Sequence, residues 1–180
     1  MHPKHTIMKL HFFSFCFLLF SFGISFGQSD TRMDFFPATS EHFAGLNVYS
    51  TTTGEFNQFY VQSGQWVKNN LIPSPKITVS GGDYRMKFLP GSETALHGLF
   101  AYSRKTGQFE FMYLDVNGWK ANPYFPKSNI KFGNSDTVLE FIPAKDGEVA
   151  YITAYSVDGD HFGMYYVNGD QWVKSEKFPQ

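Results

Sequence analysis

The chain has almost no cysteine. Among its 180 residues only Cys16 is a cysteine, and it lies in an N-terminal apolar segment that we expect to be removed. The chain that remains has no disulfide, no thiol nucleophile and no zinc site built from cysteine. We therefore expect its fold to be held by a hydrophobic core alone.

The sequence also has little net charge. It contains 15 Lys and Arg against 16 Asp and Glu, a formal charge of −1. This balance removes the electrostatic reason to expect a nucleic-acid partner or an anionic membrane surface. Hydrophobic residues make up 42% and charged residues 17%, a composition that excludes a disordered chain.

Motifs that carry common chemistry are missing as well. There is no phosphate-binding glycine loop and no Gly-x-Ser-x-Gly elbow. Outside the N-terminal segment the histidines are His42, His97 and His161, which form no close-spaced ligand motif. We therefore expect no catalytic residue, no bound metal and no cofactor.

The N-terminus has the three parts of a secretory signal peptide. Two lysines accompany an apolar run from Phe12 to Phe22, and the small residues Ser25 and Gly27 precede Gln28. The rival interpretation is an uncleaved anchor, but a membrane span needs about 20 apolar residues. We expect residues 1–27 to be removed before Gln28, and the protein to be exported to a periplasm or out of the cell.

The rest of the chain repeats itself at a step of 53 residues. Trp66, Trp119 and Trp172 are separated by this step. Further identities at the same step include Asp30/Asp83/Asp136, Phe35/Phe88/Phe141, Pro37/Pro90/Pro143, Tyr49/Tyr102/Tyr155, Phe56/Phe109/Phe162 and Tyr60/Tyr113/Tyr166. The sequence predicts one domain, residues 28–180, made of three copies at 30–82, 83–135 and 136–180.

Each copy has the pattern of four short strands. In the middle copy, residues 84–89, 96–103 and 108–115 are separated by turn sequences, and aromatic residues alternate along 108–115. Asn117-Gly118 is a strong hairpin signal before a short fourth strand. We predict an all-β fold in which each copy is a four-stranded antiparallel meander.

Such a meander is the unit of a β-propeller blade. A β-trefoil or a β-prism with pseudo-threefold symmetry are the alternatives. A propeller needs at least four blades, and three open blades would expose strand edges. A homodimer that closes a six-bladed ring would satisfy both requirements.

The segment GLFAYSRKTGQFEFMYLDVNGW, residues 98–119, resembles a blade of the secreted lectin propellers of the fucose-lectin type. The likeness covers 22 of the 53 residues of the copy. It implies a sugar held between blades by an Arg, an acid and a Trp. Arg32 and Arg85 match the Arg and Glu55 the acid, while the other copies have Val138, Gln108 and His161 at these positions.

The candidate ligand-binding residues are aromatic or basic: Trp66, Trp119, Trp172, Tyr49, Tyr102, Tyr155, Arg32 and Arg85. The three Trp side chains could stack on the apolar face of a sugar. Each could instead pack its own copy, with its N–H bound to a carbonyl, and recurrence in every copy favours packing.

These observations predict an exported, non-catalytic binding module whose target is a glycan or a surface protein, with carbohydrate held in grooves between copies. The first alternative is an envelope structural or protein-interaction subunit. The least favoured alternative is a glycoside hydrolase, because two carboxylates need only meet in space. Its candidates are Glu110, Asp115 and Glu140.

Overall fold

The computed structural model describes residues 30–36, 44–91, 96–144 and 150–177, and the secondary structure of these residues is all β. The described residues from Thr31 onward belong to one compact unit. The predicted signal peptide, Pro37 and His42 lie outside the described residues. The all-β prediction is confirmed.

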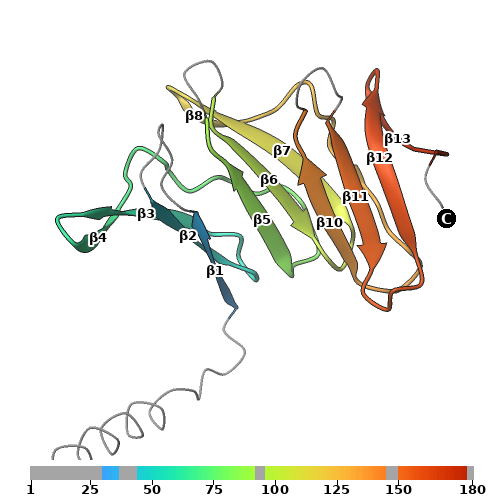
Figure 1. The fold of residues 1–180 in the computed structure, drawn as a ribbon, viewed down its shortest axis with the longest axis horizontal. Coiled ribbons are helices and arrows are strands. Elements are labelled where there is room, and N and C mark those ends of the chain that lie inside the picture. Colours follow the sequence, from blue (N-terminus) through green and yellow to red (C-terminus); the bar gives the residue numbers. More distant parts are fainter. Residues whose placement is uncertain (1–29, 37–43, 92–95, 145–149, 178–180) are drawn as a thin grey trace, which may run out of the picture. The chain divides into compact units, whose positions relative to one another are not determined.

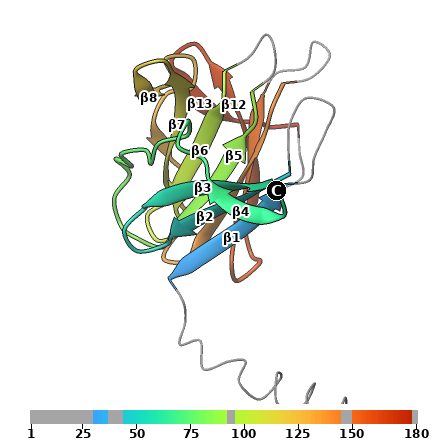
Figure 2. The same cartoon turned by 90° about the vertical axis from the view of Figure 1, so that its left-hand side faces the viewer.

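Thirteen antiparallel strands form three sheets (Figure 1). The first sheet has the order β1-β2-β3-β4 and is seen with its strands labelled in Figure 2. Its strands are β1 (Thr31–Phe36), β2 (Gly45–Ser50), β3 (Phe56–Gln62) and β4 (Gln65–Lys68).

The second and third sheets follow the same meander. The second contains β5 (Tyr84–Leu89), β6 (Gly98–Ser103), β7 (Gln108–Asp115), β8 (Gly118–Ala121) and the short β9 (Ser128–Asn129). The third contains β10 (Thr137–Ile142), β11 (Tyr151–Ser156), β12 (Phe162–Asn168) and β13 (Gln171–Lys174). Strand β9 pairs with β7, so the second sheet has five strands where the sequence predicted four.

The pairing register recurs along the chain. Thr31 pairs with Ser50, Tyr84 with Ser103, and Thr137 with Ser156, each pair 53 residues after the last. The turns recur with it, since Gly54 and Gly107 both have positive φ, 74° and 67°. A Cβ on Gly107 would lie 1.8 Å from the Ile130 carbonyl oxygen, so glycine is required there.

The second sheet is buried on both faces. On one face, Leu99, Ala101 and Met112 join Tyr49 and Phe56 of the first sheet in an apolar cluster. Because side chains alternate along a strand, the other face carries a different set. That set is Phe100, Tyr102, Phe109 and Phe111, which cluster with Leu139, Phe141 and Ile152 of the third sheet.

The β-trefoil alternative is wrong for the part of the chain that the structure describes. A trefoil joins its three units in one closed barrel, whereas these strands form three separate open sheets. The strands of each sheet pair only with one another, and the cores lie between sheets rather than inside a barrel.

Candidate functional site

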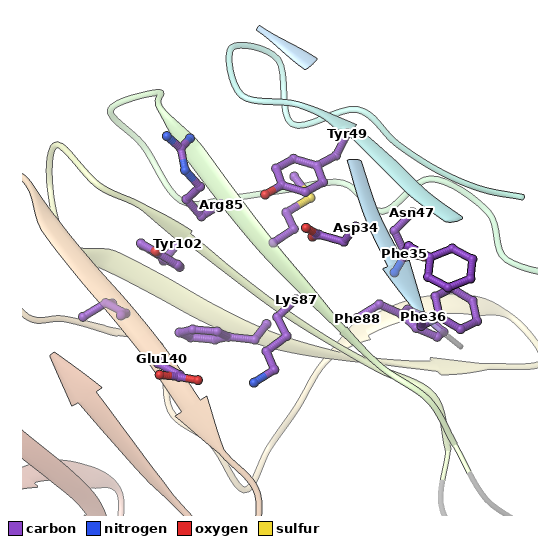
Figure 3. Close-up of a pocket in the computed structure, with 13 residues that line it drawn as sticks. Asp34, Phe35, Phe36, Asn47, Tyr49, Arg85, Lys87, Phe88, Tyr102 and Glu140 are labelled. Carbon is purple, nitrogen blue, oxygen red and sulfur yellow. The ribbon is translucent and has the colours of Figure 1, made fainter. Parts of the chain in front are cut away.

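We call the region where the first and second sheets pack together the first interface. One pocket lies in it, and a second, charged pocket is lined by residues of all three sheets. The charged pocket has a volume of about 440 Å³ and contains four ionisable side chains from three strands (Figure 3). They are Asp34 of β1, Arg85 and Lys87 of β5, and Glu140 of β10. Two positive and two negative charges face one cavity, so the pocket carries little net charge.

Arg85 is held in place by neighbours of its own strand. Its guanidinium donates to the Asp83 carboxylate at 2.6 Å and to the Tyr84 carbonyl at 2.8 Å. Asp83 also pairs with Arg104 at 3.5 Å, and Arg104 with Asp136 at 3.4 Å. The ion pairs orient Arg85 before any ligand arrives.

The other charged groups of this pocket are arranged differently. Lys87 donates to the Phe141 carbonyl at 3.2 Å, which links β5 to the third sheet. Although Asp34 is an exposed residue, the protein around its carboxyl removes water and raises its pKa, and the charge of Arg32 opposes that shift.

Tyr49 and Tyr102 complete the aromatic wall of the charged pocket. Burial raises the pKa of Tyr49, while a hydrogen bond with the Met86 backbone partly opposes the shift. Burial raises the pKa of Tyr102 to about 12, against a hydrogen bond with the Leu139 backbone. Both phenols therefore stay neutral at physiological pH and act as hydrogen-bonding groups.

The amide pocket, of about 520 Å³, lies on the other side of a pair of phenylalanine rings. Phe36 and Phe88 line both pockets and stack with their centroids 6.1 Å apart. The polar side chains that line the amide pocket are Gln58, Tyr60, Lys68, Asn69, Asn70 and His97. His97 stacks on Phe88 at 5.4 Å, and its Nδ1 accepts the Gly91 N–H at 2.8 Å.

A ladder of amides runs between the two pockets. Gln58 Nε2 donates to Asn47 Oδ1 at 3.1 Å, and Asn69 Nδ2 donates to Gln58 Oε1 at 2.8 Å. Asn47 and Gln58 are buried, and Asn47 lines the charged pocket while Gln58 and Asn69 line the amide pocket. We call these three residues the amide ladder.

The positions of Asn47 and Gln58 are not amides in the next copies, whereas Asn69 is matched by Asn122. One step along the chain, Phe100 and Phe111 replace Asn47 and Gln58, and their rings stack at 4.7 Å in the core of the second interface, between the second and third sheets. The search for identities at the 53-residue step missed the amide ladder. Its signal in the sequence is the departure from the repeat, where buried apolar positions become polar in one copy.

The structure places the predicted ligand-binding residues in several surroundings. Tyr49, Tyr102 and Arg85 are brought together in the charged pocket. Arg32 lies outside its lining and acts on Asp34 through its charge. Tyr155 is on the third sheet and exposed.

The three tryptophans lie in three different sheets. The Trp119 indole N–H donates to the Pro73 carbonyl at 2.6 Å, and the Trp172 indole N–H donates to the Pro126 carbonyl at 2.9 Å. Both rings pack against apolar clusters, whereas Trp66 is half exposed. The indoles of Trp119 and Trp172 hold sheets to the connectors that precede them.

The carboxylates considered for hydrolysis are not gathered in one site. Glu110 accepts the Thr78 N–H at 2.6 Å and also the Thr78 hydroxyl. Asp115 pairs with Lys120 at 2.5 Å. Of the three candidates, only Glu140 lines the charged pocket.

Among the described residues, no group of three or more His, Cys, Asp or Glu side chains could hold a metal ion. Within the same ranges, no helix has the length and hydrophobicity needed to cross a membrane. No model of a known protein family matches the chain, and no curated protein matches it either.

Proposed function

We propose that the protein is an exported, non-catalytic binding module that holds a neutral carbohydrate in the first interface. The amide ladder carries this proposal. Buried amides need hydrogen-bond partners and add less to stability than apolar rings do, and the second interface of the same chain has phenylalanine at the positions of Asn47 and Gln58.

The chemistry of the two pockets suits a sugar. Amide and phenol groups both donate and accept hydrogen bonds, as sugar hydroxyls do. The rings of Phe36 and Tyr60 offer apolar faces at the amide pocket. The charges of the other pocket nearly cancel, which disfavours a strongly anionic ligand such as a nucleotide.

The arrangement of the sheets supports stacked blades. The second sheet uses opposite faces for two separate cores, whereas the three sheets of a β-prism share one core. A site between blades also agrees with the resemblance to lectin-type propellers. We therefore infer three propeller-like blades of 53-residue period, with the sugar between the first and second.

A glycan array probed with the exported protein tests this function. We expect a saturable hit, and we expect the combined change Lys68→Ala and Asn70→Ala to weaken it about tenfold, since both exposed side chains line the amide pocket. The combined change Lys105→Ala and Asn117→Ala is the matched control, because both side chains are exposed and line neither pocket. Absence of any saturable glycan, or equal loss in both variants, would contradict the proposal.

A further inference from the structure

Two sheets of the chain each have an uncovered apolar face. The free face of the first sheet carries Met33, Phe35, Val61 and Trp66, all exposed. The free face of the third sheet carries the exposed aromatic side chains Tyr155 and Phe162, together with Thr153, Met164 and Tyr166. Apolar faces of this kind mark interaction surfaces.

The chain packs one sheet on the next at two interfaces. The two free faces correspond to the two opposite sides of such an interface. Met33 is 65% exposed, whereas its counterparts Met86 and Leu139 are 5% and 4% exposed because each packs against the preceding sheet. Among the described residues, no sheet precedes the first one.

The free face of the third sheet corresponds to the face that, in the first and second sheets, is covered by the following sheet. Tyr49 and Tyr102 are 5% and 7% exposed because the following sheet covers them, whereas Tyr155 at the same position is 42% exposed. The first sheet therefore needs a sheet before it and the third sheet needs a sheet after it.

We propose that a second copy of this chain covers both faces, so that the third sheet of each copy packs on the first sheet of the other. The proposal extends the interface observed between consecutive sheets, with the same residue columns on both sides. One copy supplies three blades, two supply six and three supply nine, and propellers have about four to eight. Two copies are the number that closes within this range.

The contacts between consecutive sheets predict the contacts between the two copies of the chain. The Tyr49 hydroxyl bonds to the Met86 backbone and the Tyr102 hydroxyl bonds to the Leu139 backbone, one step further on. By the same step, the Tyr155 hydroxyl bonds to the backbone of Met33 in the second copy. The half-exposed Trp66 likewise becomes buried at the new interface.

The second copy would also complete a pocket. A cavity of about 580 Å³ on the third sheet is lined by Tyr151, Met164, Tyr166, Val173 and Lys174, together with the residues that follow β13. Seven of its eight lining positions correspond to lining residues of the amide pocket, to which the second copy of the repeat adds Phe88 and His97. The third-sheet cavity has only its own wall until the first sheet of the second copy faces it.

Light scattering on the exported protein measures the expected mass. We expect twice the monomer mass at micromolar concentration. Phe162→Glu and Phe35→Glu each place a charge on one of the two faces, at side chains that are already exposed in the single chain, and each should give the monomer. Val116→Glu is the control, because Val116 is fully exposed in the β7–β8 turn.

Mixing the two face variants separates this arrangement from others. In a mixed pair, both charges lie in one interface and the other interface is of wild-type sequence. We expect the mixture to form a pair at a concentration where each variant alone is a monomer.

Three outcomes would overturn the proposal: a monomeric wild-type protein, a species larger than the dimer, or dissociation by only one of the two face variants. The last result would mean that like faces pair. Far-ultraviolet circular dichroism of each variant shows whether the fold is kept, and Tyr155→Lys replaces Phe162→Glu if that variant unfolds.

Discussion

The first and second interfaces have equivalent backbone hydrogen bonds and differ in the side chains that pack between the sheets. The Tyr84 N–H donates to the Thr51 carbonyl at 2.8 Å in the first, and the Thr137 N–H donates to the Arg104 carbonyl at 2.9 Å in the second. Within this common frame the first interface has buried amides and the amide pocket. The second has a continuous aromatic core.

The difference shows that the same arrangement of strands accepts two kinds of side-chain packing between sheets. Phe111 contacts Phe100 at 4.7 Å and Phe141 at 4.5 Å between ring centroids, so the second interface is filled by rings in edge and stacked contacts. The corresponding Gln58 of the first interface contacts only amide partners along the ladder. The second interface is filled by packed rings, whereas the first combines an apolar cluster with hydrogen-bonded amides.

The largest expected effect comes from opening the filled interface. Phe111→Ala removes a buried ring from the second interface and should lower the free energy of unfolding by about 3–5 kcal/mol. Urea unfolding followed by fluorescence measures it. Tyr124→Ala is the control, because Tyr124 is highly exposed and should cost little. An equal loss in both variants would contradict a filled second interface.

A smaller effect is expected at alkaline pH. Because the pKa of Tyr102 is raised to about 12 in the folded chain, the unfolded chain loses this proton first as the pH rises above about 10. The stabilisation is complete below pH 10 and is lost between pH 10 and pH 12, by about 3 kcal/mol for this residue.

Urea midpoints measured from pH 8 to pH 12 check this dependence. Tyr102→Phe cannot ionise, so its stability should fall less steeply over this range, after a loss of about 1 kcal/mol at neutral pH from the missing hydrogen bond with the Leu139 backbone. Parallel curves for the wild type and Tyr102→Phe would show that Tyr102 ionises equally in both states.

A loss of stability smaller than that of Phe111→Ala is expected from cutting the amide ladder. Gln58→Ala leaves Asn47 Oδ1 and Asn69 Nδ2 without their partner and should cost about 2 kcal/mol. A more specific test is the double variant Asn47→Phe with Gln58→Phe, which gives the first interface the residues that the second has at these positions.

This double variant should keep or raise the urea midpoint, because apolar rings replace buried polar groups, while glycan binding is lost. Retained binding would show that the ligand does not use the ladder.

The sequence by itself determined the strand pattern of this protein. Alternating side chains and turn glycines act within one hairpin, so the step between Tyr84 and Thr137 already predicted where equivalent strands begin. What each face of a sheet packs against depends on residues more than forty positions apart in the chain. Trp119 and Pro73, which are joined by a hydrogen bond, are an example.

Only the tertiary structure decided which positions meet across an interface. It placed Arg85 beside Tyr49 in one pocket, excluded the closed barrel of the β-trefoil alternative, and left Trp66 without the cover that Trp119 and Trp172 have. Packing between sheets is non-local, so local periodicity does not contain it.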